Sequence, residues 1–598
     1  MKVVVIGGGL AGITAAIALA QAKHEVTLLE AKPRLGGATM SFTRDGLVID
    51  TGQHVFLRCC TAYRGLLDRL GVTAQAPLQP RFDVTVFAPG KKAALRRRRV
   101  PAPLHMLPAL LGYPFLNWSQ RLRLSRVALA FRRLDPADQQ TDEQRLGDWL
   151  AAHGQDERTR RVLWDLFSVS SLNVPGDDAS LALAAVVVQT GLLGKADAAD
   201  IGVPALPLGE LHGTAAAKLL AELGVEVRLS AKVASIEPEG DQFLVRLSRT
   251  AAATEGDSSG NNSGPQRQPV DTYSAPPAPS RGPAPGEGAM GEGLPHDLGG
   301  PRGDHSPGGK YSAVVLAVPH EQAAKLMPPG ALPAETVDGW AGLGAAPIVN
   351  VHVIYDRKVM DVPFAAAVDS PVQWVFDRTR ISGMHARGGA GQYLALSQSA
   401  ADEYANMPVA ELREIFLPAL EALFPAAKDA TVTEFFVTRE KRATFRQVPG
   451  TAKLRPKAGT DLPGLVLAGS WTDTGWPDTM EGAVRSGLNA VIALAPAPDG
   501  KDRHRIGRGS KPYLPGGRPP VPPDVSAGAD TSSVAPAATT TERNATVNEI
   551  VNSSMESGAI RGTNPENSGL DAGREAVTEA TEEKKQVNIE ADEREVRS

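Results

Sequence analysis

Residues 1–30 read MKVVVIGGGLAGITAAIALAQAKHEVTLLE, and the fold follows from this stretch. Lys2 to Ile6 is a β-branched run with the composition of a buried parallel strand. A glycine turn follows directly, Ala15 to Ala22 predicts a helix of small residues, and Glu25 to Leu29 predicts a second strand. The glycines at the G-x-G-x-x-G positions are Gly7, Gly9 and Gly12. This order of elements predicts a dinucleotide-binding βαβ unit.

A nucleotide pyrophosphate is the ligand that this unit favours. The first glycine permits a tight turn, the second lets the backbone approach the pyrophosphate, and the third lets helix and strand pack closely. The helix N-terminus offers N–H groups and a partial positive charge. Glu30, after the second strand, can accept hydrogen bonds from a ribose 2′-OH and disfavours a 2′-phosphate. The expected nucleotide contacts are Gly7, Gly9, Leu10, Ala11, Gly12 and Glu30.

Composition excludes several classes of protein. The 598 residues are enough for a large core and more than one domain. A net charge of -4 gives no reason to expect a nucleic-acid partner. The adjacent Cys59 and Cys60 are too few for a disulfide framework, which favours the cytoplasm. Neither a signal peptide nor a membrane-spanning run of about 18 apolar residues is expected.

A second glycine motif follows the first unit. Arg34 precedes Gly36 and Gly37, and the chain continues to Asp50-Thr51-Gly52-Gln53-His54. Exposed backbone N–H groups beside one arginine suit a diphosphate, and the alternative is a turn with a solvated arginine. These residues resemble the start of flavin amine oxidases and phytoene-desaturase-like enzymes. Residues 50–63 and 468–477 resemble more closely the squalene-associated branch of that superfamily, the hydroxysqualene dehydroxylases.

The resemblance covers residues 1–248 and 310–495 and implies FAD as the cofactor. In these families the turn from Arg34 to Gly37 lies along the pyrophosphate and ribityl chain, and a backbone contact to adenine is expected near Val233. An acid beyond the closing strand contacts the ribityl chain or pyrophosphate, and the next helix begins against the flavin. The residues implied here are Gly469, Asp473 and Met480, with Asp478 as the alternative acid.

The predicted fold class is α/β, with a Rossmann-like FAD-binding domain around a parallel sheet and an interleaved α+β substrate domain. Gly, Pro and Ser dominate one internal stretch and the C-terminal stretch is polar, so both are predicted to be disordered. The predicted divisions are 1–75, 200–248, 310–330 and 449–496 for the FAD-binding domain, 76–199 and 331–448 for the substrate domain, 249–309 for the insertion, and 497–598 for the tail.

One part of the predicted substrate domain mixes apolar and basic residues. Val100 to Phe131 is rich in Leu and Pro, contains several arginines and follows the run Arg96 to Arg99. Such a mixture suits an element that lies on a membrane, with apolar groups in the lipid and arginines at the headgroups. It equally suits helices that cover an apolar substrate cavity, and the sequence leaves both interpretations open.

The resemblance implies that hydroxysqualene is reduced to squalene, a step of squalene and hopanoid biosynthesis, by hydride transfer to an allylic carbon. His54 is the candidate proton donor for the departing hydroxyl, and a purely structural role is its alternative. Asp83, Asp165 and Tyr113 have no stronger support. The expected partners are a long-chain isoprenoid and, at the periphery, the inner face of a membrane. No motif identifies the electron donor.

Three other functions use a similar fold. A carotenoid or polyene desaturase would use the same cofactor with electrons moving the other way. An amine oxidase would need an aromatic pair at the flavin, for which Trp471 and Trp476 are near enough in sequence. A prenyl-escort protein would carry lipid without flavin, and the intact glycine motif disfavours it.

Overall fold

The computed structural model describes residues 1–248, 271–272, 306–388 and 391–495. Most of the predicted insertion and all of the predicted tail lie outside these ranges. The predicted division into two domains is not tested and stays a prediction. Among the described residues, no helix combines the length and the apolar composition that a membrane crossing needs.

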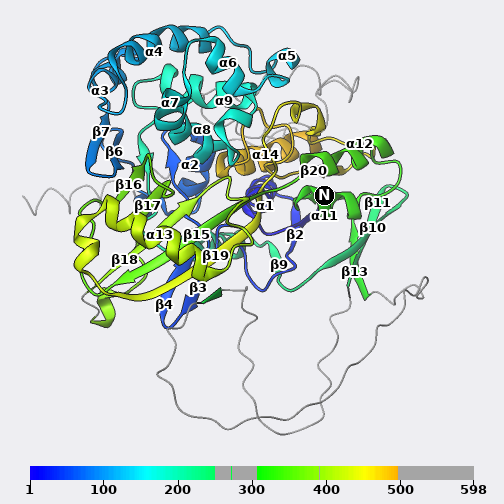
Figure 1. Ribbon diagram of the computed structural model, residues 1–598. Coiled ribbons are helices and arrows are strands. Elements are labelled where there is room, and N and C mark those ends of the chain that lie inside the picture. Colours follow the sequence, from blue (N-terminus) through cyan, green and yellow to red (C-terminus); the bar gives the residue numbers. More distant parts are fainter. Residues whose placement is uncertain (249–270, 273–305, 389–390, 496–598) are drawn as a thin grey trace, which may run out of the picture. The chain divides into compact units, whose positions relative to one another are not determined.

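A five-stranded parallel sheet forms one half of the fold (Figure 1), in the order β20-β14-β1-β2-β9. Its strands are β1 (Lys2–Ile6), β2 (Glu25–Leu29), β9 (Glu226–Arg228), β14 (Ala313–Leu316) and β20 (Leu465–Leu467). Four consecutive residues in each of β1 and β2 are buried, as expected for strands covered on both faces. β1 lies between β2, the next strand along the chain, and β14, a much later one. At such a switch in strand order, α/β folds bind their ligands outside the carboxyl ends of the strands. The sheet confirms the predicted α/β class.

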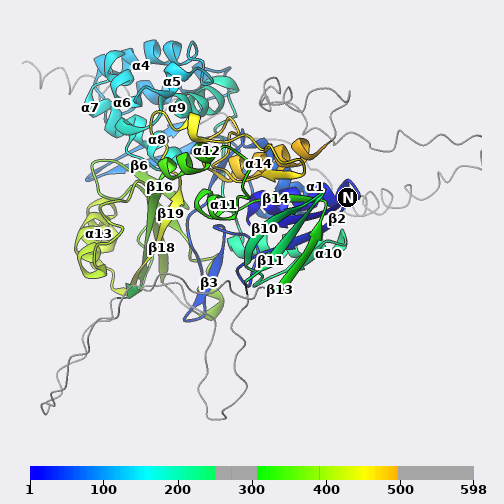
Figure 2. The same ribbon diagram turned by 90° about the vertical axis from the view of Figure 1, so that its right-hand side faces the viewer.

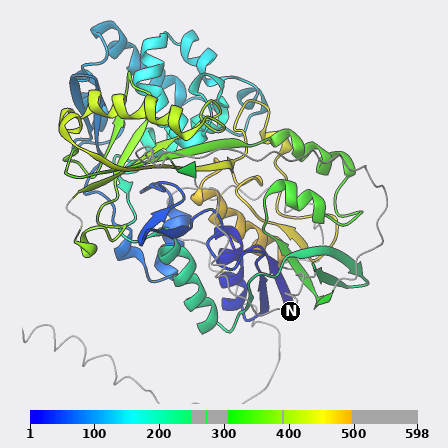
Figure 3. The ribbon, with the colours of Figure 1, turned by 60° about the horizontal axis from the view of Figure 1, so that its bottom comes forward.

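Helices cover this sheet. α1 (Leu10–Gln21) begins directly after the glycine turn, so it starts five residues before the predicted Ala15. Figure 3 shows α14 (Met480–Leu494, orange) beside α1 (dark blue), and Gly487 of α14 lies against the backbone of Ala11. α10 (Ala215–Glu222) also packs on α1.

An eight-stranded sheet forms the other half, in the order β12-β19-β15-β18-β17-β16-β6-β7. Only the β16–β6 pair in it is parallel among the described residues. Its strands are β6 (Asp83–Ala88), β7 (Lys91–Arg96), β12 (Asp271–Thr272), β15 (Ala346–Tyr355), β16 (Phe364–Ala367), β17 (Trp374–Asp377), β18 (Gln392–Gln398) and β19 (Val432–Thr444). Smaller sheets comprise β3 (Ser41–Arg44) with β4 (Leu47–Asp50), β5 (Phe56–Leu57) with β8 (Ile201–Gly202), and β10 (Val233–Glu239), β11 (Gln242–Leu247) and β13 (Ser306–Tyr311).

A layer of short helices packs beside the larger sheet, and Figures 1 and 2 both draw α4 on its outside. This layer contains α3 (Leu107–Leu111), α4 (Trp118–Phe131), α5 (Gln139–Asp142), α6 (Leu146–Ala152), α7 (Glu157–Thr159), α8 (Asp165–Leu172) and α9 (Leu181–Val187). The remaining helices are α2 (Thr61–Arg69), α11 (His320–Leu326), α12 (Ala334–Gly339) and α13 (Val409–Leu423).

Candidate nucleotide and active site

The first glycine turn leaves no room for side chains at two of its positions. Gly7 has a φ of +111°, and a Cβ there would lie 2.2 Å from the carbonyl oxygen of Ala317. A Cβ on Gly12 would lie 1.9 Å from the carbonyl oxygen of Gly7. Gly9 differs, because its nearest neighbour would be the Cα of Gly37 at 3.9 Å. The fold itself therefore requires glycine at positions 7 and 12, whereas position 9 has space that only a ligand would fill.

The two glycine motifs touch each other. The backbone N–H of Gly36 donates to the carbonyl oxygen of Gly8 at 2.9 Å. Gly37 has a φ of +58°, and a Cβ there would lie 2.9 Å from the Cα of Gly9. Gly9 is also the N-cap residue of α1, and no side chain in the described part of the protein caps that helix. The start of α1 therefore presents backbone N–H groups, including those of Leu10 and Ala11, next to the second motif, as an anion site requires.

Glu30 and Arg34 lie at the edge of this cradle. The carboxylate of Glu30 accepts hydrogen bonds from the backbone N–H groups of Gly8 at 2.6 Å and Lys32 at 2.7 Å. Arg34 contacts the sulfur of Met40, and its Nε is buried with no hydrogen-bond partner among the described residues. Burial lowers the pKa of Arg34, and the charge of Glu30 opposes that shift. An unsatisfied guanidinium and a cradle of backbone N–H groups fit a diphosphate.

The closing strand leads to the last predicted contacts. Gly469, with a φ of +138°, follows β20 and donates its N–H to Ser486 Oγ at 2.8 Å. Asp473 is exposed, which leaves its carboxylate accessible to a ligand. Asp478 accepts a hydrogen bond from the N–H of Phe445 at 2.8 Å, and burial raises its pKa. The predicted ribityl contact at Asp473, with Asp478 as the alternative, stays a prediction.

Arg455 holds the turn that carries these acids by hydrogen bonds to its backbone. The sequence does not predict this role. Its buried guanidinium donates to the carbonyl oxygens of Ser470 at 3.0 Å, Thr472 at 2.6 Å and Trp476 at 2.8 Å. Thr479 then caps α14 by accepting from the N–H of Gly482, so that Met480 is the first helical residue. The turn is therefore fixed before any ligand binds. No local sequence pattern predicts the role of Arg455, because its hydrogen-bond acceptors are backbone carbonyl groups, which every residue has.

Val233 is the first residue of β10 and is buried. It pairs with Leu247 of β11, outside the parallel sheet. The predicted adenine contact at Val233 stays a prediction.

Asp50 joins three segments beside the cradle. Its carboxylate accepts from Ser41 Oγ at 2.5 Å and from the N–H of Leu208 at 3.0 Å. It also forms a buried ion pair with Arg378 from the other half of the fold. This carboxylate therefore fixes the segment that leads to His54 against both halves.

His54 lies on this segment with its imidazole against Gly52. Its Nδ1 is buried and finds no hydrogen-bond partner in the described ranges. Burial lowers the pKa of His54, and the nearby carboxylate of Asp50 opposes that shift. The imidazole is therefore mostly neutral at pH 7. Gln53 Oε1 and Asn350 Oδ1 are likewise buried and unsatisfied by any described residue, so polar groups that a ligand could satisfy lie next to His54 in the sequence and on β15.

A second histidine near His54 was not predicted. His212 is fully buried, with its Nε2 hydrogen-bonded to the hydroxyl of Tyr63 at 2.8 Å. Burial lowers the pKa of His212 to about 3, and His54 adds to the shift. Tyr63 is in turn held at its backbone by Glu481 of α14, at 2.8 Å. His212 therefore connects the surroundings of His54, through Tyr63, to the helix that begins at Met480.

The weaker acid candidates are occupied elsewhere. The Tyr113 hydroxyl donates to the carbonyl oxygen of Val162 at 2.8 Å inside the helical layer. Asp83 forms an ion pair with Arg96 at 2.6 Å. Burial raises the pKa of Asp165 to about 6, and its carboxylate lies against Gly176 in the same layer. Their contacts lie outside the glycine cradle.

The two tryptophans do not form an aromatic pair with each other. Trp471 packs edge-on against Trp340, with ring centroids 4.9 Å apart, and donates to the carbonyl oxygen of Val318 at 2.9 Å. Trp476 packs under the guanidinium of Arg485, 4.5 Å from the ring centroid. Trp471 and Trp476 therefore do not form the aromatic pair that an amine oxidase would need at the flavin.

His352 in β15 provides a prediction on pH. Burial lowers its pKa to about 3, and its ring lies 2.8 Å from the Tyr393 hydroxyl and 3.0 Å from Thr438 Oγ1. The unfolded chain takes up the proton near pH 6.5, so the stability from this group is complete above about pH 6.5 and falls as the pH drops toward 3. At about pH 5 the loss is about 2 kcal/mol.

The His352→Gln variant should lose less stability than the wild type between about pH 7 and about pH 5, as measured by urea unfolding of the apoprotein. His385→Gln, at an exposed histidine, is the matched control and should leave the pH dependence unchanged. Equal pH dependence in His352→Gln and the wild type would contradict the assigned pKa.

Comparison with known proteins agrees with this geometry. The model of the family described as flavin containing amine oxidoreductase matches residues 10–258 and 301–495. Hydroxysqualene dehydroxylases of Rhodopseudomonas palustris and Zymomonas mobilis are 26% and 25% identical, over 81% and 82% of this chain and 96% and 98% of theirs. A 15-cis-phytoene desaturase of Glycine max is 22% identical over 83% of this chain and 79% of its own.

The solved structures share the fold. A putrescine oxidase bound to putrescine superimposes with a TM-score of 0.55 at 17% identity, covering 82% of this chain and 98% of that one. A cyclohexylamine oxidase from Brevibacterium oxydans gives a TM-score of 0.54 at 18% identity, with the same coverage. The predicted superfamily, Rossmann-like fold and FAD cofactor are confirmed. The chain belongs to the flavin containing amine oxidoreductase family and is an FAD-dependent oxidoreductase.

Proposed function

We propose that this enzyme reduces hydroxysqualene to squalene in squalene and hopanoid biosynthesis. The observation that carries the proposal is the similarity to hydroxysqualene dehydroxylases, which spans 81–82% of this chain and nearly the whole of those proteins. When bound in its reduced form, FAD supplies a hydride equivalent, which with one proton converts the allylic alcohol into the hydrocarbon and water. The carotenoid desaturases at 22–23% identity make polyene desaturation the second candidate.

The residues that would hold the cofactor are those of the cradle. The N–H groups at the start of α1, with Arg34 and the Gly36–Gly37 turn, would bind the diphosphate, and Glu30 would bind the adenosine ribose. Asp473 or Asp478 would contact the ribityl chain and Val233 the adenine, and the positive end of α14, which begins at Met480, would face the flavin. Gly469 provides the tight turn after β20.

A small apolar cavity of about 10 Å³, room for about one water molecule, lies in the helical layer. It lies among α4, α6, α8 and α9, and its lining includes Phe131, Trp164, Phe167 and Leu172, with Ser168 as the only polar side chain among the described residues. Such a lining has little to offer an amine, because it presents no carboxylate and a single hydroxyl. The substrate and product dissolve in membranes, so we place the enzyme in the cytoplasm, at the inner face of a membrane.

We assign the proton donor to His54. The imidazolium is the donor, and burial lowers its pKa, so turnover should increase as the pH falls below the usual pKa range of histidine. His54→Gln should remove this acid limb and lower kcat by about 100-fold while FAD binding is retained. A pH profile that is unchanged in His54→Gln would leave His54 a structural residue.

The experiment that tests the proposed function is product analysis. FAD-loaded enzyme with an excess of reductant is incubated without oxygen with hydroxysqualene, and oxidised enzyme is incubated in parallel with phytoene. The proposal expects squalene by mass spectrometry from the first reaction and unchanged phytoene from the second. Desaturated phytoene with no squalene would make the enzyme a polyene desaturase.

A further inference from the structure

Large apolar side chains that are exposed gather in one part of the described chain. Ten such side chains are exposed in the described ranges, and six of them lie between residues 100 and 129. These six are Val100, Leu104, Leu107, Trp118, Leu122 and Leu129. Single exposed apolar residues are ordinary, but a concentration of this kind in a protein of this size marks an interaction site.

Helix α4 carries an apolar stripe on each of two opposite faces. Leu124, Val127 and Phe131 are buried and hold the helix to the protein. Trp118, Leu122 and Leu129 recur at positions i, i+4 and i+11, so they form one line on the other face. Trp118 and Leu122 are each 66% exposed and Leu129 is 51% exposed. A surface helix needs only the first stripe for folding, so the second has no structural task in the described chain.

Basic residues surround the outer stripe. Residues 84–134 contain eleven Lys and Arg and no Asp or Glu, whereas the whole chain has a net charge of -4. At helical spacing Arg121 and Arg126 fall on either side of the stripe. Arg121 lies 5.0 Å from the Trp118 ring centroid, and Arg126 is exposed. The surface is therefore apolar along its centre and cationic along its margins.

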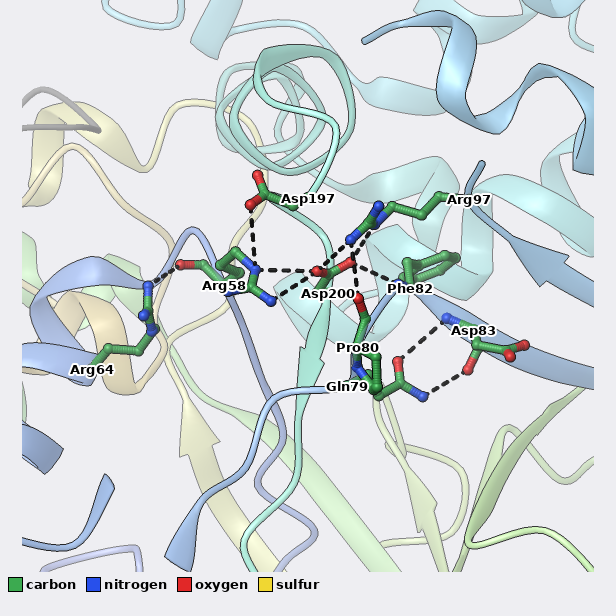
Figure 4. A network of polar contacts seen from close by, with 9 residues as sticks. All are labelled: Arg58, Arg64, Gln79, Pro80, Phe82, Asp83, Arg97, Asp197 and Asp200. Carbon is green, nitrogen blue, oxygen red and sulfur yellow. Dashed lines mark hydrogen bonds and ion pairs between the residues drawn. The ribbon is translucent and has the colours of Figure 1, made fainter. Parts of the chain in front are cut away.

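The base of this surface is firmly anchored. Figure 4 shows Arg97, which follows β7, paired with the fully buried Asp200 at 2.6 Å, and Arg58 paired with the same carboxylate at 3.0 Å. Burial alone would raise the pKa of Asp200, but the hydrogen bonds from Arg97 and Arg58 lower it. Arg97 thus turns inward, whereas its neighbours Arg98 and Arg99 are exposed. Arg98 and Arg99 are therefore exposed next to a backbone segment that the Arg97–Asp200 ion pair holds in place.

We propose that the α3–α4 surface, defined as residues 96–132, docks on an anionic lipid bilayer. The outer stripe would enter the acyl boundary, and Arg98, Arg99, Arg123 and Arg126 would meet lipid phosphates. A second copy of the chain fits this surface poorly, because a two-fold contact would place arginines against arginines. A nucleic acid would leave the apolar stripe without a partner.

Bilayer docking would bring the helical layer next to the membrane in which the proposed substrate dissolves. Phe131 belongs to the buried stripe of α4 and also lines the small apolar cavity. When α4 is docked, the thickness of this one helix would separate the lipid from the cavity. This inference deepens the proposed function, since hydroxysqualene dissolves in the bilayer. Vesicle binding is measured without substrate, so docking and turnover can each fail alone.

The test is co-sedimentation of the full-length FAD-loaded chain with vesicles. The wild type should bind vesicles of phosphatidylcholine with phosphatidylglycerol, and it should bind phosphatidylcholine alone about tenfold more weakly. Replacing Trp118, Leu122 and Leu129 together by serine should weaken binding to the anionic vesicles by about tenfold or more. The matched control, Leu229→Ser with Ile492→Ser, removes exposed apolar side chains elsewhere and should bind as the wild type does.

A charge variant keeps the test independent of the stripe. Arg123→Glu with Arg126→Glu should abolish the preference for anionic vesicles while retaining FAD and the wild-type circular dichroism. Equal binding by the wild type and the triple serine variant would overturn the proposal. So would a wild-type dimer in light scattering that the serine variant dissolves, because a second copy would then cover the surface.

Discussion

Replacing Glu481 by alanine is expected to lower the free energy of unfolding by about 3–5 kcal/mol. Glu481 is 1% exposed, and its carboxylate accepts from the N–H groups of Ala62 at 3.2 Å and Tyr63 at 2.8 Å. These are first-turn groups of α2, whose N-cap residue Cys60 provides no side-chain cap in the described structure. The same carboxylate pairs with the buried Arg485 at 2.8 Å. Its removal therefore takes away the buried ion-pair partner of Arg485 and leaves two buried backbone donors unsatisfied.

Urea unfolding of the apoprotein by circular dichroism measures this loss. The matched control is Glu411→Ala, because Glu411 also lies in the first turn of a helix but is exposed. That variant should change the free energy of unfolding by less than about 0.5 kcal/mol. An equal, small effect in both variants would show that Glu481 does not bridge α2 and α14.

Replacing Gly9 by alanine is expected to weaken FAD binding by about 10- to 100-fold without harming the fold. The backbone conformation at Gly9 has a φ of -77°, which any residue adopts, and the nearest atom to an added Cβ is 3.9 Å away. The methyl group would project between the two glycine motifs, where we propose that the pyrophosphate lies against the backbone. The apoprotein therefore has room for an alanine side chain at position 9. When FAD is bound, the added methyl group would clash with the cofactor.

The affinity is measured by titrating apoprotein with FAD and following flavin fluorescence. Gly65→Ala is the control, since Gly65 lies in α2 and an added Cβ meets nothing within 4 Å. It should bind FAD normally and be slightly more stable, because alanine favours helix over glycine by about 1 kcal/mol. Normal FAD affinity in Gly9→Ala would mean that the pyrophosphate does not lie against Gly9.

The nucleotide half of the fold could be predicted because its signals are local. Four buried residues in a row in β1, a glycine turn and an acid at the end of β2 lie within the first 30 residues. The sequence predicts the start of α1 five residues too late, because Gly12, two residues inside the helix, is a residue typical of turns. Glycine lowers helix propensity, but here close packing on β1 overrides it.

The contacts that hold the site together could not be predicted, because they join residues far apart in sequence. Glu481 caps a helix 419 positions earlier, and Asp50 pairs with Arg378 across 328 positions. His212 likewise reaches Tyr63 from 149 positions away. None of these residues belongs to a periodic pattern in the sequence. The role of each becomes visible only in the folded structure, where its partner lies next to it. The exposed stripe on α4 is different, since its spacing is visible in the sequence but its exposure is not.

The measurement that most directly tests the central claim is a single turnover without oxygen. FAD-loaded enzyme is reduced with two electrons per flavin and then mixed with hydroxysqualene. Flavin absorbance and the amount of squalene are followed together. We expect the flavin to reoxidise with the formation of one squalene per flavin, a stoichiometry that follows from one hydride per allylic alcohol. A flavin that stays reduced in the presence of hydroxysqualene, in enzyme that holds FAD, would contradict the account.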